Sequence, residues 1–141
     1  MFVKQISVFI ENRKGRLADF TKVLGDAGVD LVALSVADTT DFGILRAIVT
    51  DTEKGVKVLR DAGYTVNITD VLAVAVPDVP GGLAKVVGVL SEKNISIEYL
   101  YSFVRNVNGC AIIIFRVDQP VQTADMLREN GITILNQEEI H

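Results

Sequence analysis

Two stretches of the chain, 66 residues apart, repeat one pattern of turn, glycine and amphipathic run. The first reads ENRKGRLADFTKVLGDAGVDL and begins at Glu11, and the second reads PDVPGGLAKVVGVLSEKNISI and begins at Pro77. At this spacing Gly15 matches Gly81, and the residues that follow keep the same apolar positions. Self-similarity at a fixed period is the sequence signature of a duplicated structural unit. The sequence therefore predicts two copies of one architecture.

The match continues through the second half of each copy, with a change of spacing. Gly43 matches Gly109 at 66 residues, whereas Gly63 matches Gly131 at 68 residues. This alignment places a two-residue insertion near Gln119.

Both copies predict the order strand, helix, strand, strand, helix, strand. Apolar alternation and β-rich runs indicate the strands, and apolar residues three or four apart indicate the helices between them. The predicted strands cover residues 4–10, 29–38, 43–49 and 64–68 in the first copy, and 70–76, 95–104, 110–117 and 132–135 in the second. The boundary falls near Thr69-Asp70, so we predict one domain over residues 1–69 and another over residues 70–141.

The order βαββαβ is that of the ferredoxin-like sandwich. We therefore predict an α+β chain of two ferredoxin-like βαββαβ sandwiches, each an antiparallel sheet with helices on one face. The run CAIIIF at residues 110–115 is apolar throughout. A strand that is apolar on both sides expects cover on both sides, and a homodimer is the simplest way to cover the open face.

Composition excludes several functional classes. No run approaches the ~20 apolar residues of a membrane span, and the N-terminus has no long apolar segment, so we expect no membrane partner and no signal peptide. The single Cys110 excludes an intramolecular disulfide and favours the cytoplasm; we interpret it as inert core. The net charge of −4 is the opposite of the basic charge typical of nucleic-acid-binding proteins, so we expect no nucleic-acid partner. With one histidine, His141, at the last position, we expect no metal, no cofactor and no enzymatic activity.

The glycine turns carry the binding chemistry. A glycine-rich turn at a helix N-terminus presents backbone N–H groups and the positive end of the helix dipole, which suits a carboxylate. Asn12 and Asp78 precede the two turns at matching positions, and either oxygen could accept a hydrogen bond from an ammonium group. The plainer interpretation is that both residues cap helices and that the glycines only shape the turns.

The combination of strand, glycine turn, Leu-Ala helix start and βαββαβ order resembles the ACT domain, over essentially the whole chain and twice. The second stretch is close to the common form of the family, whereas the first has Lys14 in place of the proline. The resemblance implies a stand-alone tandem ACT protein with a regulatory, allosteric role in amino-acid metabolism. It also implies a free amino acid bound at an interface between two units, beside the first turn of one and the second strand of the other.

The candidate ligand-binding residues follow from the turns and from that resemblance. They are Asn12, Arg13, Lys14, Gly15, Arg16, Leu17, Ser35 and Asp38 in the first copy, and Asp78, Val79, Pro80, Gly81, Gly82, Leu83 and Tyr101 in the second. For the basic cluster of the first turn, we favour a solvated loop, and the alternative is that it steers an anionic ligand or docks an acidic partner. Tyr99 and Tyr101 share one face of their predicted strand, where packing is the alternative to ligand contact.

Three functions compete. The first is a ligand-sensing regulatory protein that binds a free amino acid between its repeats. The second is a scaffold or regulatory subunit that docks an amino-acid biosynthetic enzyme without a ligand of its own. The third is RNA binding, since RNA-recognition domains share this element order, but GCAIIIF lacks the basic residue and paired aromatics of their motif.

Overall fold

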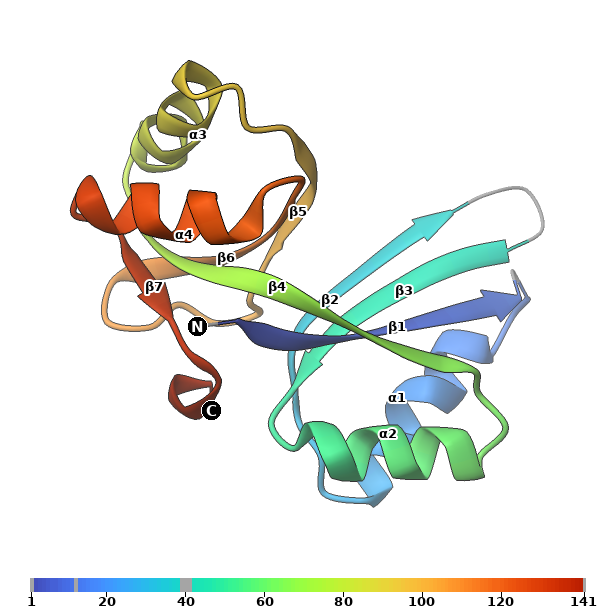
Figure 1. Ribbon diagram of the computed structural model, residues 1–141. Helices are drawn as coiled ribbons and strands as arrows, with labels where there is room; N and C mark the ends of the chain where they lie inside the picture. The colour runs from blue at the N-terminus through green and yellow to red at the C-terminus, as the bar shows by residue number, and fades with distance from the viewer. Residues whose placement is uncertain (1, 12, 39–41, 141) are drawn as a thin grey trace. The chain divides into compact units, whose positions relative to one another are not determined.

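A computed structural model describes residues 2–11, 13–38 and 42–140. The chain divides into two compact units (Figure 1). One comprises residues 4–69, and the other comprises residues 70–140 together with residues 2–3 at the start of the chain. Phe2 packs against the core of the second unit, and Val3 is fully buried.

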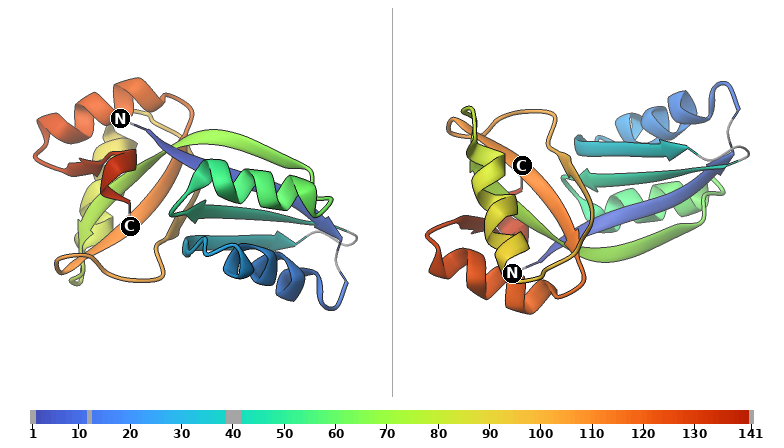
Figure 2. Two further views of the ribbon diagram at one scale, coloured as in Figure 1. Left: turned by 90° about the horizontal axis from the view of Figure 1, so that it is seen from below. Right: turned by 90° about the horizontal axis from the view of Figure 1, so that it is seen from above.

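The first unit has the predicted order βαββαβ. Its elements are β1 (Val3–Glu11), α1 (Arg16–Asp26), β2 (Leu31–Asp38), β3 (Phe42–Val49), α2 (Thr52–Asp61) and the start of β4 (Val66–Pro77). The strands lie in the order β2-β3-β1-β4, and β3 is antiparallel to both β1 and β2. Figure 2 shows α1 and α2 together on one face of these strands.

The second unit repeats the order. The remainder of β4 leads to α3 (Gly82–Glu92), β5 (Ile97–Ser102), β6 (Cys110–Val117), α4 (Pro120–Glu129), β7 (Thr133–Leu135) and the short 3-10 helix η1 (Gln137–Glu139). The strands lie in the order β7-β4-β6-β5, and every pair is antiparallel. The predicted α+β fold of two ferredoxin-like sandwiches is confirmed.

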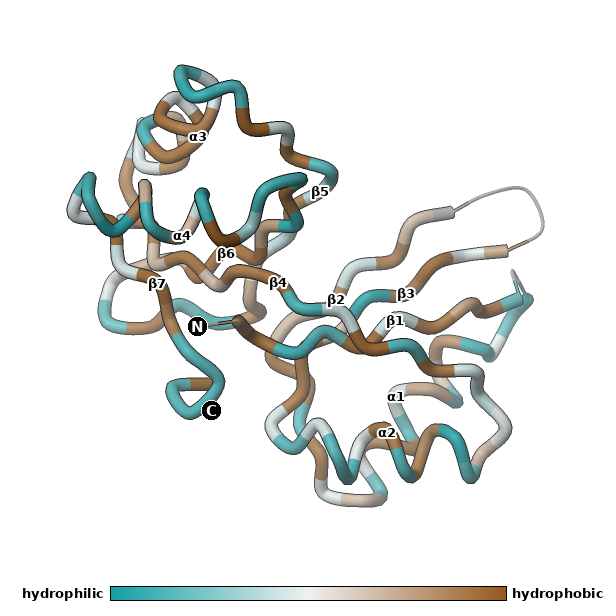
Figure 3. Tube along the Cα trace, viewed as in Figure 1, coloured by the Kyte–Doolittle hydropathy of each residue, from teal (hydrophilic) through white to brown (hydrophobic). Residues whose placement is uncertain are grey.

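Each unit has its own aliphatic core between helices and sheet. In the first, Phe20 and Leu24 of α1 and Leu59 of α2 are fully buried against β1 and β3. In the second, Leu90 of α3 and Leu127 of α4 take the equivalent positions. The helices expose their other side to water, which gives α2 the alternating colours of Figure 3.

The strand registers correct the alignment of the two copies. Glu11 pairs with Phe42, and the equivalent Pro77 pairs with Cys110. Cys110 therefore corresponds to Phe42 at a spacing of 68, and Gly109 does not correspond to Gly43. The two-residue insertion lies before β6 rather than near Gln119, because strand pairing, unlike residue identity, fixes equivalence along the whole strand.

Several predicted strands have different bounds in the structure. The strands predicted over 64–68 and 70–76 form one continuous strand, β4, which begins at Val66 rather than at residue 64 and in which Asp70 continues the extended backbone. β5 ends at Ser102, two residues before the predicted end. The four residues from Ile112 to Phe115 are buried within this one chain, so β6 no longer supports the homodimer, which stays a prediction.

Candidate ligand-binding site

The turn between β4 and α3 is built on glycine. Gly81 is the N-terminal cap of α3 and has φ of 84°, a left-handed conformation that glycine adopts without steric cost. The N–H of Val79 donates to the Pro77 carbonyl at 2.9 Å, and the N–H of Gly82 donates to the Val79 carbonyl at 3.0 Å. No side chain caps α3. The positive end of this helix is therefore left for a ligand or water to satisfy.

Gly82 is required at its position for a different reason. A Cβ atom on this residue would lie 2.2 Å from the carbonyl oxygen of Pro77, well inside any real contact distance. The helix therefore begins in direct contact with the backbone of β4.

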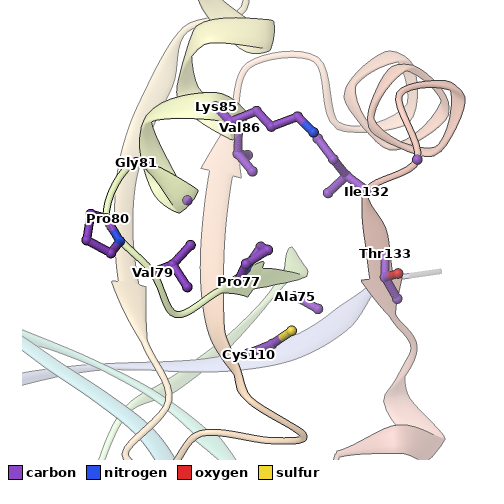
Figure 4. A pocket seen from close by; sticks show the side chains of 12 residues that line it. Ala75, Pro77, Val79, Pro80, Gly81, Lys85, Val86, Cys110, Ile132 and Thr133 are labelled. Carbon is purple, nitrogen blue, oxygen red and sulfur yellow. The ribbon is translucent and has the colours of Figure 1, made fainter.

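A cavity of about 410 Å³ opens beside this turn, inside the second unit. Figure 4 shows side chains from β4, the turn, α3, β6 and the start of β7 arranged around one opening. Its lining is mainly apolar, and the charged side chain that reaches over it belongs to Lys85. The lining residues are Ala75, Pro77, Val79, Pro80, Gly81, Gly82, Lys85, Val86, Cys110, Gly131, Ile132 and Thr133. The volume lies in the range of small-molecule sites.

Asp78 does not cap α3, so that interpretation of the residue is wrong. Its carboxylate accepts a hydrogen bond from the side-chain amide of Asn106, and its N–H donates to the Gly109 carbonyl at 3.3 Å. Asp78 is exposed and does not line the cavity. These two bonds tie the start of the turn to the loop before β6.

The turn of the first unit also places a left-handed glycine before its helix, but its side chains and the spacing of its backbone hydrogen bonds differ. Gly15 caps α1 with φ of 88°, again without a side-chain cap. Arg13 pairs with Glu11 at 2.8 Å, and Lys14 is exposed. A smaller cavity of about 190 Å³ is lined by Ile10, Glu11, Arg13, Arg16, Leu17, Val36 and Gly43. Of the candidate residues in the first copy, the structure thus brings Arg13, Arg16 and Leu17 together.

In the first unit, aromatic and charged side chains occupy the positions that line the larger cavity of the second. The Tyr64 ring meets Phe20 edge to face at 5.7 Å, and the Arg16 guanidinium lies 5.0 Å from its centre. The Tyr64 hydroxyl donates to the Asp19 carboxylate at 2.5 Å. Burial, followed by this hydrogen bond, raises the pKa of Tyr64 to about 12.

The remaining candidates lie outside both cavities. Ser35 is half-buried on β2, opposite Arg46. Tyr101 stacks on Tyr99 at 6.4 Å on β5, which places the two rings on one face as predicted. Leu83 is exposed beside the turn.

Two candidates fall outside what can be described. Asn12 lies outside the described residues, as does the side chain of Asp38, whose backbone pairs with Gly43 at the end of β2.

Sequence reasoning missed the lining residues other than Val79, Pro80, Gly81 and Gly82, and it assigned one of them, Cys110, to an inert core. The others that it missed are Ala75, Pro77, Lys85, Val86, Gly131, Ile132 and Thr133. Cys110 is half-buried and lines the cavity. The signal that could have found them is the repeat itself. In the alignment of the two copies, Asp19 corresponds to Lys85 and Tyr64 corresponds to Ile132. The first pair changes the charge and the second changes the size of the side chain, although the surrounding pattern is similar.

Within residues 2–11, 13–38 and 42–140, no group of three or more histidine, cysteine or acidic side chains could hold a metal ion. In the same part of the chain, no helix has both the length and the apolar character to cross a membrane.

The duplicated βαββαβ fold with its paired glycine turns defines a class of tandem ferredoxin-like domains. Residues 1–141 match the family described as ACT domain pair, and the chain belongs to that family. The chain matches no curated protein.

Solved structures agree with this assignment. Protein BT0572 from Bacteroides thetaiotaomicron is 41% identical, with a TM-score of 0.90 over 99% of this chain and 98% of that one. The regulatory subunit of aspartate kinase from Thermus thermophilus, in its ligand-free form, is 14% identical, with a TM-score of 0.63 over 89% and 91%. The regulatory subunit of aspartate kinase from Thermus flavus is 15% identical, with a TM-score of 0.60 over 87% and 86%. At these identities the aspartate kinase subunits show a shared fold alone.

Proposed function

We propose that the chain is a non-catalytic regulatory protein that binds a free amino acid at the glycine turn of its second unit. The observation that carries this proposal is the cavity of about 410 Å³ beside the uncapped N-terminus of α3. An open helix N-terminus favours a carboxylate through its N–H groups and dipole. The predicted position of the ligand between the two units is left as a prediction, and the proposal uses the second unit alone.

Asp78 supplies the second half of the recognition. Asp78 lies outside the cavity lining but only three residues before Gly81, and its carboxylate accepts a hydrogen bond from Asn106. A carboxylate has several lone pairs and can accept an ammonium donor at the same time. Replacing Asp78 with alanine should weaken amino-acid binding, whereas Asn106→Ala removes only the internal hydrogen bond and serves as the control.

The test is a thermal-shift screen against the twenty amino acids, with two matched variants. We expect one amino acid, or a few related ones, to raise Tm, and a hundredfold excess over Kd corresponds to about 2.7 kcal/mol. Gly81→Val and Gly15→Val place the same side chain at φ of 84° and 88°, each with open space around the Cβ. Both should lower the starting Tm, but only Gly81→Val should abolish the ligand-induced rise.

The screen also has a refuting result. A protein whose Tm responds to no amino acid, or a Gly81→Val variant that responds as the parent does, would contradict an amino-acid site at this turn.

A second candidate function is the docking of an amino-acid metabolic enzyme without a ligand. It is favoured by the fold shared with aspartate kinase regulatory subunits. It is also favoured by Phe9 and Phe42, which lie on neighbouring strands of the first unit and are 59% and 54% exposed. Capture of one enzyme in stoichiometric amount from a cytoplasmic extract, unchanged by added amino acids, would favour docking. The cytoplasmic location and the homodimer stay predictions.

A further inference from the structure

We propose that the cavity of the second unit selects amino acids with an apolar side chain, that Lys85 adds an ion pair to the contact that the α3 N-terminus makes with their carboxylate, and that the first unit has no equivalent site. This inference rests on the proposed function, because it assigns a ligand class to the same site. The evidence is the comparison of the two copies. In the first unit, side chains of the protein fill the space between the first helix and the last strand, whereas in the second unit the matching space is an open cavity.

The difference in filling comes from three matched positions. Arg16, Phe20 and Tyr64 of the first unit correspond to Gly82, Val86 and Ile132 of the second. The Tyr64 side chain is 5% exposed and packs edge to face on Phe20, with Arg16 over its ring. Replacing each of these side chains by a smaller one leaves the opening seen in Figure 4.

The side chain that occupies this space in the first unit indicates what kind of group the cavity of the second unit can hold. A phenol ring with its polar end toward α1 occupies the frame in the first unit, where Asp19 accepts the hydroxyl hydrogen bond. In the second unit the space is bounded by Val79, Val86 and Ile132, so an apolar group of side-chain size fits it. Filling such a space removes apolar surface from water, which favours binding.

The charge at the polar end is reversed. Lys85 stands where Asp19 stands in the first unit, and its amine extends toward Ile132 over the cavity (Figure 4). Among the described residues no carboxylate pairs with Lys85, and no acidic side chain lines the cavity. The cavity therefore favours an anionic group near Lys85 and disfavours a cationic side chain.

The test is isothermal titration of the whole chain with L-leucine, L-methionine, L-phenylalanine, L-lysine and L-leucinamide. We expect at least one of the three apolar amino acids to bind with one site per chain. We expect at least about tenfold weaker binding of L-lysine and L-leucinamide, the latter because it keeps the side chain and amine of leucine but has no carboxylate charge.

Two independent variants give the second unit the side chains of the first. Ile132→Tyr and Val86→Phe should each weaken binding at least about tenfold by occupying the cavity. Lys85→Met should weaken binding of the amino acid and leave binding of L-leucinamide unchanged. Lys93→Met, which removes an exposed lysine at the far end of α3, should bind as the parent does.

The outcomes separate this inference from the proposed function. Amino-acid binding that is unaffected by both Ile132→Tyr and Val86→Phe, or that has two equal sites per chain, would overturn the inference and leave the proposed function standing. Failure of every amino acid to bind would overturn the proposed function. In that case 4-methylpentanoate, a carboxylate without an amine, decides: binding that is lost in Ile132→Tyr supports the cavity assignment, and no binding overturns it as well.

Discussion

Replacing Gly82 with alanine should destabilise the protein, although alanine is ordinarily the better helix former. The new Cβ would lie 2.2 Å from the Pro77 carbonyl oxygen, whereas real contacts of this kind essentially never fall below 3.0 Å. The helix start or the end of β4 must therefore move by about 0.8 Å. The same carbonyl accepts the Val79 N–H at 2.9 Å, so movement also strains the turn.

The magnitude follows from two opposing terms. Overpacking of this kind costs about 1–3 kcal/mol, and the gain from replacing a helical glycine with alanine is about 0.5–1 kcal/mol. We expect Gly82→Ala to lower the free energy of unfolding by about 1–2 kcal/mol. Gly88 offers a matched control in the same helix, because a Cβ there has nothing within 4 Å. Gly88→Ala should raise the free energy of unfolding by about 0.5–1 kcal/mol.

Urea denaturation followed by circular dichroism measures both variants against the parent. The sign of the change is the informative quantity, since the two substitutions are chemically identical. If Gly82→Ala were as stable as Gly88→Ala, the contact with Pro77 would not be rigid. The turn would then relax toward that of the first unit, where Arg16 occupies the position and its N–H lies 3.4 Å from the Arg13 carbonyl instead of 3.0 Å.

Three further changes test the packing. Tyr64→Phe removes the hydrogen bond to Asp19 and should cost about 1.5 kcal/mol in urea titrations near neutral pH, where full stability in this variant would contradict the assigned bond. Folding raises the Tyr64 pKa from 10 to about 12, so the stabilisation from this side chain is complete below pH 10 and is lost as the pH rises through 12. The difference in the free energy of unfolding between the parent and Tyr64→Phe should therefore narrow between these pH values when both are measured at each pH. Asp51→Ala removes the side chain that caps α2 through the Lys54 N–H at 3.2 Å and should lower the urea midpoint by an amount equivalent to about 1 kcal/mol, with no change expected if the cap were fully replaced by water. Leu90→Ala, at a fully packed site of α3, should cost about 2–5 kcal/mol in the same assay, and a loss below 1 kcal/mol would mean that the core refills the space.

The fold was predictable because local signals and the repeat agree. Gly28, Gly63 and Gly131 end helices with positive φ, as their places after apolar helical stripes predict. Asn108-Gly109 forms the predicted tight turn, with φ of 51° and 76°. Each of these features is decided within a few residues, and the duplication provides a second, independent reading of the same pattern.

The site was less predictable because its lining comes from segments far apart in the chain. Val79 belongs to the turn, but Cys110 and Ile132 reach the same cavity from β6 and the start of β7. Spacing along the sequence carries no information about such a meeting. Asp78 fits a helix cap by residue type, yet the left-handed Gly81 takes that place, and the sequence gives no sign of the bond from Asn106.

Because the strand β4 is continuous through the boundary of the repeat, the two copies are not independent structural modules. A cut between Thr69 and Asp70 follows the boundary of the repeat, yet it severs the twelve-residue strand β4 after its fourth residue. It would also remove Phe2 and Val3, which belong with the second unit, from the fragment that contains residues 70–140. The repeats can be recognised separately in the sequence, but they cannot be exchanged as cassettes at that boundary.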